Sequence, residues 1–133
     1  MSQETHDLWT EKYRPNSTKK VVLPPKVRTF FNKIISTKIL PNLILYYPKP
    51  GNGKTSLAKA ICHDLELEDS SDIMYINASQ SANIDLLRND ITDFASVWSI
   101  DNKIKVVILD EMENSTTAFQ NALKVFSEVY SEA

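Results

Sequence analysis

The sequence feature that most constrains the fold is a glycine-containing turn, Pro50–Ser56, placed between a short apolar run and an amphipathic segment. The apolar run, residues 43–47, lies between prolines and predicts a buried strand. After the turn, Leu57, Ile61 and Leu65 recur at helical spacing, which predicts a helix that begins within the turn itself. A strand, a tight turn and a helix in this order are typical of α/β folds built on a parallel sheet.

The remainder of the chain continues this alternation. Amphipathic segments predict further helices at residues 24–35, 83–98 and 115–130. Apolar runs predict further strands at residues 73–77 and 103–109. Because parallel strands are joined by crossover connections that contain helices, we predict an α/β fold with a parallel sheet flanked by helices.

Residue types add detail to these elements. Asn83 and Ser115 are expected to cap the helices that they precede, because their side chains can accept hydrogen bonds from first-turn N–H groups. Val106–Leu109 is continuously apolar, so we expect both of its faces to be buried. Phe94 and Trp98 lie on the apolar stripe of their helix and are expected in the core.

The glycine-containing turn also has the residues that a phosphate site needs. Gly51 and Gly53 let the backbone curl so that successive N–H groups converge on a phosphate, and the following helix adds the positive end of its dipole. Lys54 can place a positive charge beside the β- and γ-phosphates, and the Thr55 hydroxyl can ligate Mg²⁺. The general pattern asks for a further glycine where this chain has Pro48. The turn therefore predicts a binding site for a nucleoside triphosphate.

Two acidic residues, Asp110 and Glu111, follow the strand predicted at residues 103–109. A strand near the centre of a parallel sheet presents such residues at its carboxyl end, where ligands bind. Asp110 is suited to hold Mg²⁺ directly or through water, and Glu111 is suited to polarise a water for attack on the γ-phosphate. Together with the glycine-containing turn, this acidic pair predicts an NTPase site.

Composition is that of a globular protein of one domain, with 133 residues, 42% hydrophobic and 24% charged. The absence of a long apolar run excludes a membrane span, the polar N-terminus argues against a signal peptide, and we expect a cytoplasmic protein. Residues 1–60 carry 11 basic and 3 acidic side chains, against 4 and 14 in residues 61–133. The basic half could attract nucleotide or DNA phosphates, although solvated faces that neutralise each other explain the same pattern.

Four sequence boxes, in order along the chain, resemble those of clamp-loader ATPases, the replication factor C group of AAA+ proteins. The boxes are Trp9–Pro15, Ile76–Ser79 followed by Ile84–Arg88, Asp110–Glu113 and Gln120–Leu123. Glu113 stands where the family usually has aspartate. The resemblance covers about residues 8–131 and is greatest to the clamp loaders of tailed bacteriophages.

This resemblance implies a P-loop NTPase (AAA+) fold, with a nucleotide-docking arm at residues 1–22 and an N-terminal part of an ATP-binding domain at residues 23–133. The implied ATP-binding residues are Thr10, Glu11, Lys12, Tyr13, Val22, Gly51, Asn52, Gly53, Lys54, Thr55 and Ser56. Thr55 and Asp110 are implied to hold Mg²⁺, and Lys54 and Glu111 to act in ATP hydrolysis.

The resemblance also implies partners: other clamp-loader subunits, the sliding clamp and primer-template DNA, in the cytoplasm of an infected bacterial cell and with no membrane partner. Arg88 is implied to face the DNA backbone, and residues 94–100 to approach the clamp. Because the family takes an arginine from a neighbouring subunit for hydrolysis, we expect the isolated chain to be nearly inert.

The family continues after the acidic box with a further strand, an arginine finger, a helical lid and a collar domain, none of which this sequence contains. We therefore expect an incomplete sheet, with no ladder between residues 43–47 and 106–109. We also expect the N-terminal portion of a larger ATPase, arising by truncation or completed by a separately encoded C-terminal half. Two alternatives remain: another AAA+ DNA-remodelling ATPase, against which the Trp9–Pro15 box argues, and a truncated subunit that binds nucleotide or partners without turnover.

Overall fold

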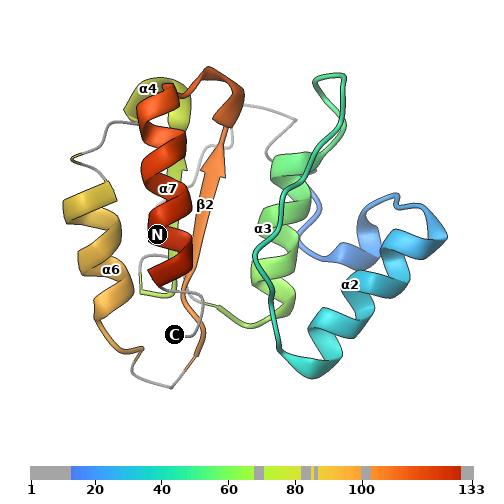
Figure 1. The fold of residues 1–133 in the computed structure, drawn as a ribbon. Helices are drawn as coiled ribbons and strands as arrows, with labels where there is room; N and C mark the ends of the chain where they lie inside the picture. The colour runs from blue at the N-terminus through green and yellow to red at the C-terminus, as the bar shows by residue number, and fades with distance from the viewer. Residues whose placement is uncertain (1–12, 68–70, 82–84, 86, 100–102, 130–133) are drawn as a thin grey trace, which may run out of the picture. The chain divides into compact units, whose positions relative to one another are not determined.

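The computed structural model describes residues 13–67, 71–81, 85, 87–99 and 103–129. They belong to two compact units, Met1–Glu66 and Leu67–Ala133, which we name the N-terminal and C-terminal units and describe one at a time. Figure 1 labels helices α2, α3, α4, α6 and α7 and strand β2. Among the described helices, none has the length and apolar character needed to cross a membrane.

In the N-terminal unit, helix α2 spans Pro25–Thr37. It begins at a proline pair because Pro25, in the first helical turn, has no N–H group that would need an intrahelical partner. It ends at Lys38, whose left-handed backbone has a φ of 55°. Phe31 and Ile34 are buried. The helix predicted at residues 24–35 is confirmed.

Helix α3, Lys54–Asp64, follows the glycine-containing turn as predicted. Leu57, Ile61 and Leu65 are all buried, so the predicted inward face is also confirmed. A short 3-10 turn, η1 (Thr18–Lys20), precedes α2 and was not predicted.

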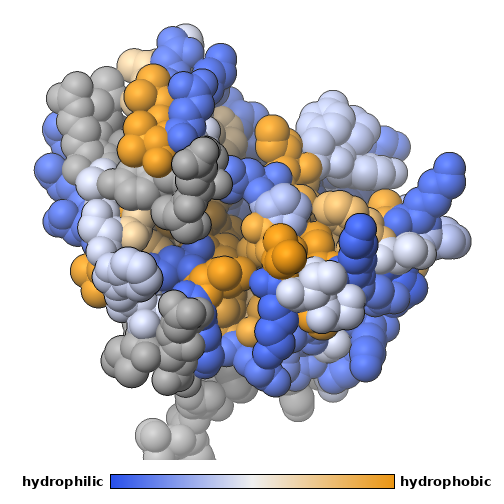
Figure 2. Space-filling model, turned by 60° about the horizontal axis from the view of Figure 1, so that its bottom comes forward, coloured by the Kyte–Doolittle hydropathy of each residue, from blue (hydrophilic) through white to orange (hydrophobic). Residues whose placement is uncertain are grey.

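The apolar run at residues 43–47 forms no strand in the structure, although it was predicted as a buried one. Ile44 is 94% exposed and Tyr46 is 81% exposed, so the prediction is wrong. The physical reason is that a strand needs hydrogen bonds to a neighbouring strand, and the sheet of the described residues contains β1 and β2 alone. Figure 2 shows hydrophobic side chains, coloured orange, reaching the surface among hydrophilic ones.

In the C-terminal unit, strands β1 (Ile73–Asn77) and β2 (Val106–Asp110) form a parallel pair. Their register places Asn77 opposite Asp110, so the two carboxyl ends meet at one edge. Both strands and their parallel arrangement confirm the sequence prediction. Nothing in the described residues pairs β2 with residues 43–47, as expected for an incomplete sheet.

Short helical segments lie between the two strands: α4 (Ala78–Ser81), the π-helical turn η2 (Leu87–Ile91) and α6 (Thr92–Ser96). The 3-10 turn η3 (Met112–Asn114) and the longer helix α7 (Thr117–Val129) follow β2. The core of the unit consists of Ile76, Ile91 and Phe119. The partly buried side chains packed on this core are Met74, Val107, Leu109, Met112, Ala122, Leu123 and Phe126. Helix α7 thus covers one face of the sheet (Figure 1).

The expectation that Val106–Leu109 is buried on both faces is wrong, because every residue of β2 is only half-buried. Val107 and Leu109 point toward the core formed with α7, and alternate residues of a strand point to the opposite face. With one hydrogen-bonded neighbour in the described sheet, β2 is an edge strand and lacks the cover of a central one.

The cap of α7 is Thr116 and not Ser115. The Phe119 N–H donates to Thr116 Oγ1 at 3.2 Å, whereas the Ser115 hydroxyl donates to the Met112 carbonyl at 2.6 Å. The helix begins one residue later than predicted, and for this reason the hydroxyl of Thr116 rather than that of Ser115 reaches the first-turn N–H groups. Asn83, the other expected cap, lies outside the described residues.

Candidate nucleotide-binding site

The phosphate loop leads directly into helix α3. Gly51 has a φ of 75° and Gly53 a φ of 76°, both in the left-handed region where a side chain is strained. Apart from the adjoining residues of the chain, nothing lies within 4 Å of where a Cβ would stand at either position, so the backbone conformation and not crowding requires glycine here. The Asn52 amide donates to the Lys49 carbonyl at 2.8 Å and braces the turn.

Gly53 is the N-cap of α3 and supplies no side chain to cap it. The first turn of a helix presents backbone N–H groups that the helix itself does not use, and the helix dipole is positive at this end. The first turn contains Lys54, Thr55 and Ser56, each half-buried. A cation, two hydroxyls and the N–H groups around them are the arrangement that binds phosphate oxygens.

The acidic pair lies at the carboxyl end of β2. Asp110 Oδ2 accepts a hydrogen bond from the Tyr75 hydroxyl at 2.5 Å, and its Oδ1 accepts one from the Glu111 N–H at 3.0 Å. Both oxygens of the carboxylate are therefore held in one orientation. The Glu111 side chain is exposed, and its backbone has a φ of 55°.

Tyr75 is a site residue that sequence reasoning missed. Its partner Asp110 is 35 residues away, and the contact arises only because the parallel register sets Tyr75 opposite Ile108, on the same face as the end of β2. The signal in the sequence is weak: a tyrosine two residues before the end of a predicted strand. Asn77, for which a turn role is the default, has that role, since its side chain accepts from the Ser79 N–H at 2.9 Å.

The structure places the two halves of the predicted site in different units. The phosphate loop belongs to the N-terminal unit, and Asp110 and Glu111 belong to the C-terminal unit. The helix after the phosphate loop and the strand before the acidic pair are as predicted, but the strand expected before the phosphate loop, at residues 43–47, does not form. The joint action of the two halves on one nucleotide stays a prediction.

Other predicted site residues are only partly described. Residues 10–12 lie outside the described part of the chain. Tyr13 is 65% exposed and Val22 is 96% exposed, so neither buries its side chain within the described protein. Arg88 lies in the π-helical turn η2, and its side chain is outside what the structure describes.

The predicted chemistry needs Mg²⁺, and each half of the predicted site contains an oxygen donor of the kind that this ion prefers. Mg²⁺ prefers hard oxygen ligands and usually takes one or two protein groups together with substrate phosphates and water. The Thr55 hydroxyl and the Asp110 carboxylate are such ligands. A metal site made of protein ligands alone would need a cluster of three or more His, Cys, Asp or Glu side chains. No such cluster occurs among the described residues.

The segment predicted to approach the clamp has an exposed apolar surface. Trp98 is 86% exposed and Val97 is 61% exposed, so the expectation that Trp98 is a core residue is wrong. Phe94 is half-buried, with Lys105 Nζ 4.6 Å from its ring centroid and hydrogen-bonded to its carbonyl at 3.0 Å. Helix α6 ends at Ser96, before the predicted end at residue 98, which removes Trp98 from the inward stripe.

A glycine loop at the start of a helix and an acidic pair at the end of a parallel strand define a P-loop NTPase. Residues 44–132, more than half of the chain, match the family described as "ATPase family associated with various cellular activities (AAA)". The chain therefore belongs to the AAA family of ATPases. Membership of this family implies a nucleotide site.

The relatives of the chain include replication proteins of phages and of yeast. It is 39% identical over 129 residues to the sliding-clamp-loader large subunit of Enterobacteria phage T4, covering 96% of this chain and 39% of that protein. It is 38% identical over 122 residues to the same subunit of Escherichia phage RB69, covering 91% and 37%. It is 40% identical over 126 residues to replication factor C subunit 3 of Saccharomyces cerevisiae, covering 93% and 37%. The chain thus spans about two fifths of the length of these relatives.

Proposed function

We propose that this chain is the ATP-binding part of a subunit of a DNA polymerase sliding-clamp loader, an ATPase that places the clamp on primer-template DNA. The observation that carries the proposal is the phosphate loop, where two glycines in left-handed backbone lead into the first turn of α3. Similarity to proteins named sliding-clamp-loader and replication factor C subunits, extending over at least 91% of this chain, supports the choice among ATPases.

Nucleotide binding uses groups of the N-terminal unit. The backbone N–H groups of residues 51–56 donate to phosphate oxygens, and Lys54 neutralises charge on the β- and γ-phosphates. Residues 10–13 and Val22 contact the adenine. The exposure of Tyr13 and Val22 supports this assignment, because their apolar surface is available to a ligand.

Hydrolysis transfers the γ-phosphoryl group of ATP to water and releases ADP. Thr55 and Asp110 would hold Mg²⁺, which would neutralise charge on the phosphate oxygens. The Glu111 carboxylate orients the attacking water and accepts its proton, while the bond from the γ-phosphorus to the β–γ bridging oxygen breaks. An arginine of a neighbouring subunit completes the charge stabilisation, so turnover belongs to the assembled loader.

We assign partners by the surfaces that suit them. The exposed apolar side chains of Val97 and Trp98 contact the sliding clamp. Arg88, which is positively charged, contacts the phosphates of the DNA backbone. Other loader subunits are the remaining partners. We place this machinery in the cytoplasm of an infected bacterial cell.

The direct test is ATP binding by the chain and by Lys54→Ala, measured by titration calorimetry. Loss of the positioned cation should weaken ATP binding on the order of a hundredfold, because hydrogen bonds to charged groups contribute about 1.5–3 kcal/mol each. Lys33→Ala is the matched control, since Lys33 is an exposed lysine of α2 outside the phosphate loop. Equal ATP affinity in all three proteins would exclude the phosphate loop as the binding site.

Assembly into a loader is tested separately, by ATP hydrolysis in the reconstituted complex. Stimulation of hydrolysis by clamp together with primed DNA supports the proposed function. A rate of ATP hydrolysis that does not change when clamp and primed DNA are added would indicate an AAA ATPase of another kind.

A further inference from the structure

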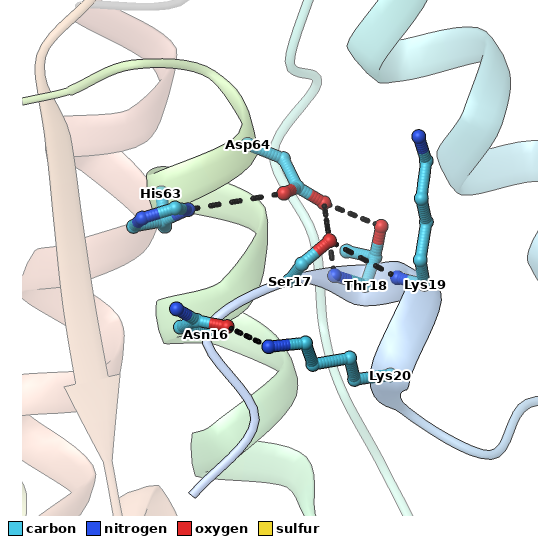
Figure 3. Close-up of polar contacts among 7 residues, drawn as sticks. All are labelled: Asn16, Ser17, Thr18, Lys19, Lys20, His63 and Asp64. Carbon is cyan, nitrogen blue, oxygen red and sulfur yellow. Dashed lines mark hydrogen bonds and ion pairs between the residues drawn. The ribbon is translucent and has the colours of Figure 1, made fainter.

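Asp64, the last residue of helix α3, is the acceptor for a cluster of hydrogen bonds from the chain segment before α2 (Figure 3). One oxygen, Oδ2, accepts from the Thr18 hydroxyl at 2.6 Å, the Thr18 N–H at 2.9 Å and the Ser17 hydroxyl at 3.3 Å. The other oxygen, Oδ1, lies 3.9 Å from His63 Nδ1. A carboxylate 46 residues away thus accepts the Thr18 N–H in the first turn of η1, while the Ser17 hydroxyl accepts the Lys19 N–H at 3.3 Å.

The cluster is sheltered from water. Thr18 is 3% exposed, and the Asp64 side chain is 15% exposed. Burial raises the pKa of Asp64, but hydrogen bonds from Thr18 and Ser17, with the nearby His63, outweigh it and hold the pKa below its ordinary value of 3.8. The carboxylate is therefore ionised at neutral pH and bound to donors, as a buried charge must be.

The anchored segment is held at a second point and carries exposed apolar side chains on both sides of the anchor. Arg28 Nη2 donates to the Val21 carbonyl at 2.8 Å, which fixes the segment to α2. Tyr13 lies before the anchor and Val22 after it, 65% and 96% exposed. The backbone is fixed while these side chains remain available, which is the arrangement of a preformed contact surface for an apolar, planar ligand group.

Helix α3 connects this anchor to the phosphate loop. The loop precedes its first residue, Lys54, and Asp64 is its last, so the two ends of one rigid helix of 11 residues lie roughly 15 Å apart. Movement of the anchored segment relative to the phosphate loop therefore requires breaking the contacts of Asp64.

We propose that Asp64 and Thr18 are positioning residues that fix residues 13–22 to the phosphate-loop helix, so that the base of a bound nucleotide meets an ordered surface. The proposal rests on the proposed function, in which the phosphate loop binds a nucleoside triphosphate and Tyr13 and Val22 contact its base. The anchor acts on the base end of the ligand and leaves the phosphate end unaffected.

The test compares two ligands, ATP and inorganic tripolyphosphate, because the second has the phosphates without the base. Asp64→Ala and Thr18→Val should each weaken ATP binding on the order of tenfold. Without the anchor, residues 13–22 must become ordered when ATP binds, and the entropy lost in this ordering reduces the affinity. Tripolyphosphate affinity should stay within about twofold of the original value. Thr18→Ser keeps the hydroxyl and should restore ATP affinity.

Glu66→Gln is the matched control, because it removes one negative charge two residues from Asp64 while Glu66 contacts Lys38 and not the anchored segment. It should leave both affinities unchanged. Equal loss of ATP and tripolyphosphate binding in Asp64→Ala would contradict the proposal, as would unchanged ATP binding. An unmodified chain that binds neither ligand overturns the proposed function and this proposal with it.

A second measurement needs no variant and so does not depend on the variants folding. Amide hydrogen exchange of residues 18–21 in the unmodified chain should slow when ATP is added and stay the same when tripolyphosphate is added. Equal slowing by both ligands would overturn the positioning role, because the phosphates alone would then order the segment.

Discussion

Glu111 combines an exposed carboxylate with an unusual backbone conformation. Its φ of 55° and ψ of 39° lie in the left-handed region, which costs a non-glycine residue about 1–2 kcal/mol. Such residues persist where the surrounding structure holds them, and they cluster at functional sites. The N–H of Glu111 also binds Asp110 Oδ1, so the turn that presents one carboxylate orients the other.

Replacing Glu111 with glutamine should separate binding from turnover. Glu111→Gln keeps the size of the side chain and removes its ability to accept a proton, so ATP affinity should stay within about twofold while hydrolysis by the assembled loader falls about 10²–10⁴-fold. ATP titration and phosphate release measure the two quantities. A loss of ATP affinity as large as that of Lys54→Ala would contradict the role assigned to Glu111.

The lowered pKa of Asp64 predicts a pH dependence of stability. A carboxyl group with a lower pKa in the folded protein than in the unfolded chain stabilises the fold above the unfolded value and loses this effect as the pH falls. The contribution of Asp64 should therefore be complete near neutral pH and decline as the pH falls below its ordinary value of 3.8. Urea unfolding at several pH values measures it.

Asp64→Asn serves as the comparison for that measurement. It cannot ionise, so its free energy of unfolding should fall less steeply with acid than that of the unmodified chain. An identical pH profile for the two proteins would show that the hydrogen bonds from Thr18 and Ser17 do not favour the ionised carboxyl group.

At the level of elements, helix α7 and strand β2 depend on each other through Phe119, which is 0% exposed. Phe119→Ala should lower the free energy of unfolding of the C-terminal unit by about 3–5 kcal/mol, because it removes buried apolar surface and leaves a cavity. Val125→Ala on the same helix is the control, since Val125 is 62% exposed and its loss should change stability by about 0.5 kcal/mol or less. Equal effects of the two substitutions in urea unfolding would mean that α7 does not pack on the sheet through Phe119.

Elements marked by a contiguous sequence pattern were predictable from the sequence. Helix α3 starts where a glycine turn gives way to helical spacing, and β1 and β2 are apolar runs that pair with each other in the predicted parallel sense. Residues 43–47 have the same apolar character and yet form no strand, because pairing depends on a neighbour that the described sheet does not provide.

In the candidate site, too, contiguous sequence motifs were predictable and contacts between distant residues were not. The phosphate loop and the acidic pair are contiguous in sequence, so their residue types and spacing reveal them. Contacts between distant residues are different: Tyr75 reaches Asp110 across 35 positions, and Thr18 reaches Asp64 across 46. Nothing in the sequence around Tyr75 or Thr18 indicates which residue it contacts. These contacts follow from the strand register and the packing of the helices, which the structure provides.

For the molecule as a whole, charge and ligand chemistry agree. The basic excess in residues 1–60 surrounds the phosphate loop in the sequence, while the acidic excess in residues 61–133 includes the carboxylates suited to a metal and a water. A net positive region raises the local concentration of a polyanionic nucleotide. Nucleotide hydrolysis by this chain therefore needs two chemically different parts of the chain to act on one ligand.

The most direct test of that central claim is ATP affinity with and without Mg²⁺, for the unmodified chain and for Asp110→Asn. If the acidic end of β2 reaches the nucleotide held by the phosphate loop, Mg²⁺ should strengthen ATP binding in the unmodified chain. Asp110→Asn should lose much of that gain and keep its metal-free affinity, because it removes a charged metal ligand and leaves the loop intact. An equal gain from Mg²⁺ in both proteins would contradict a single site built from both halves.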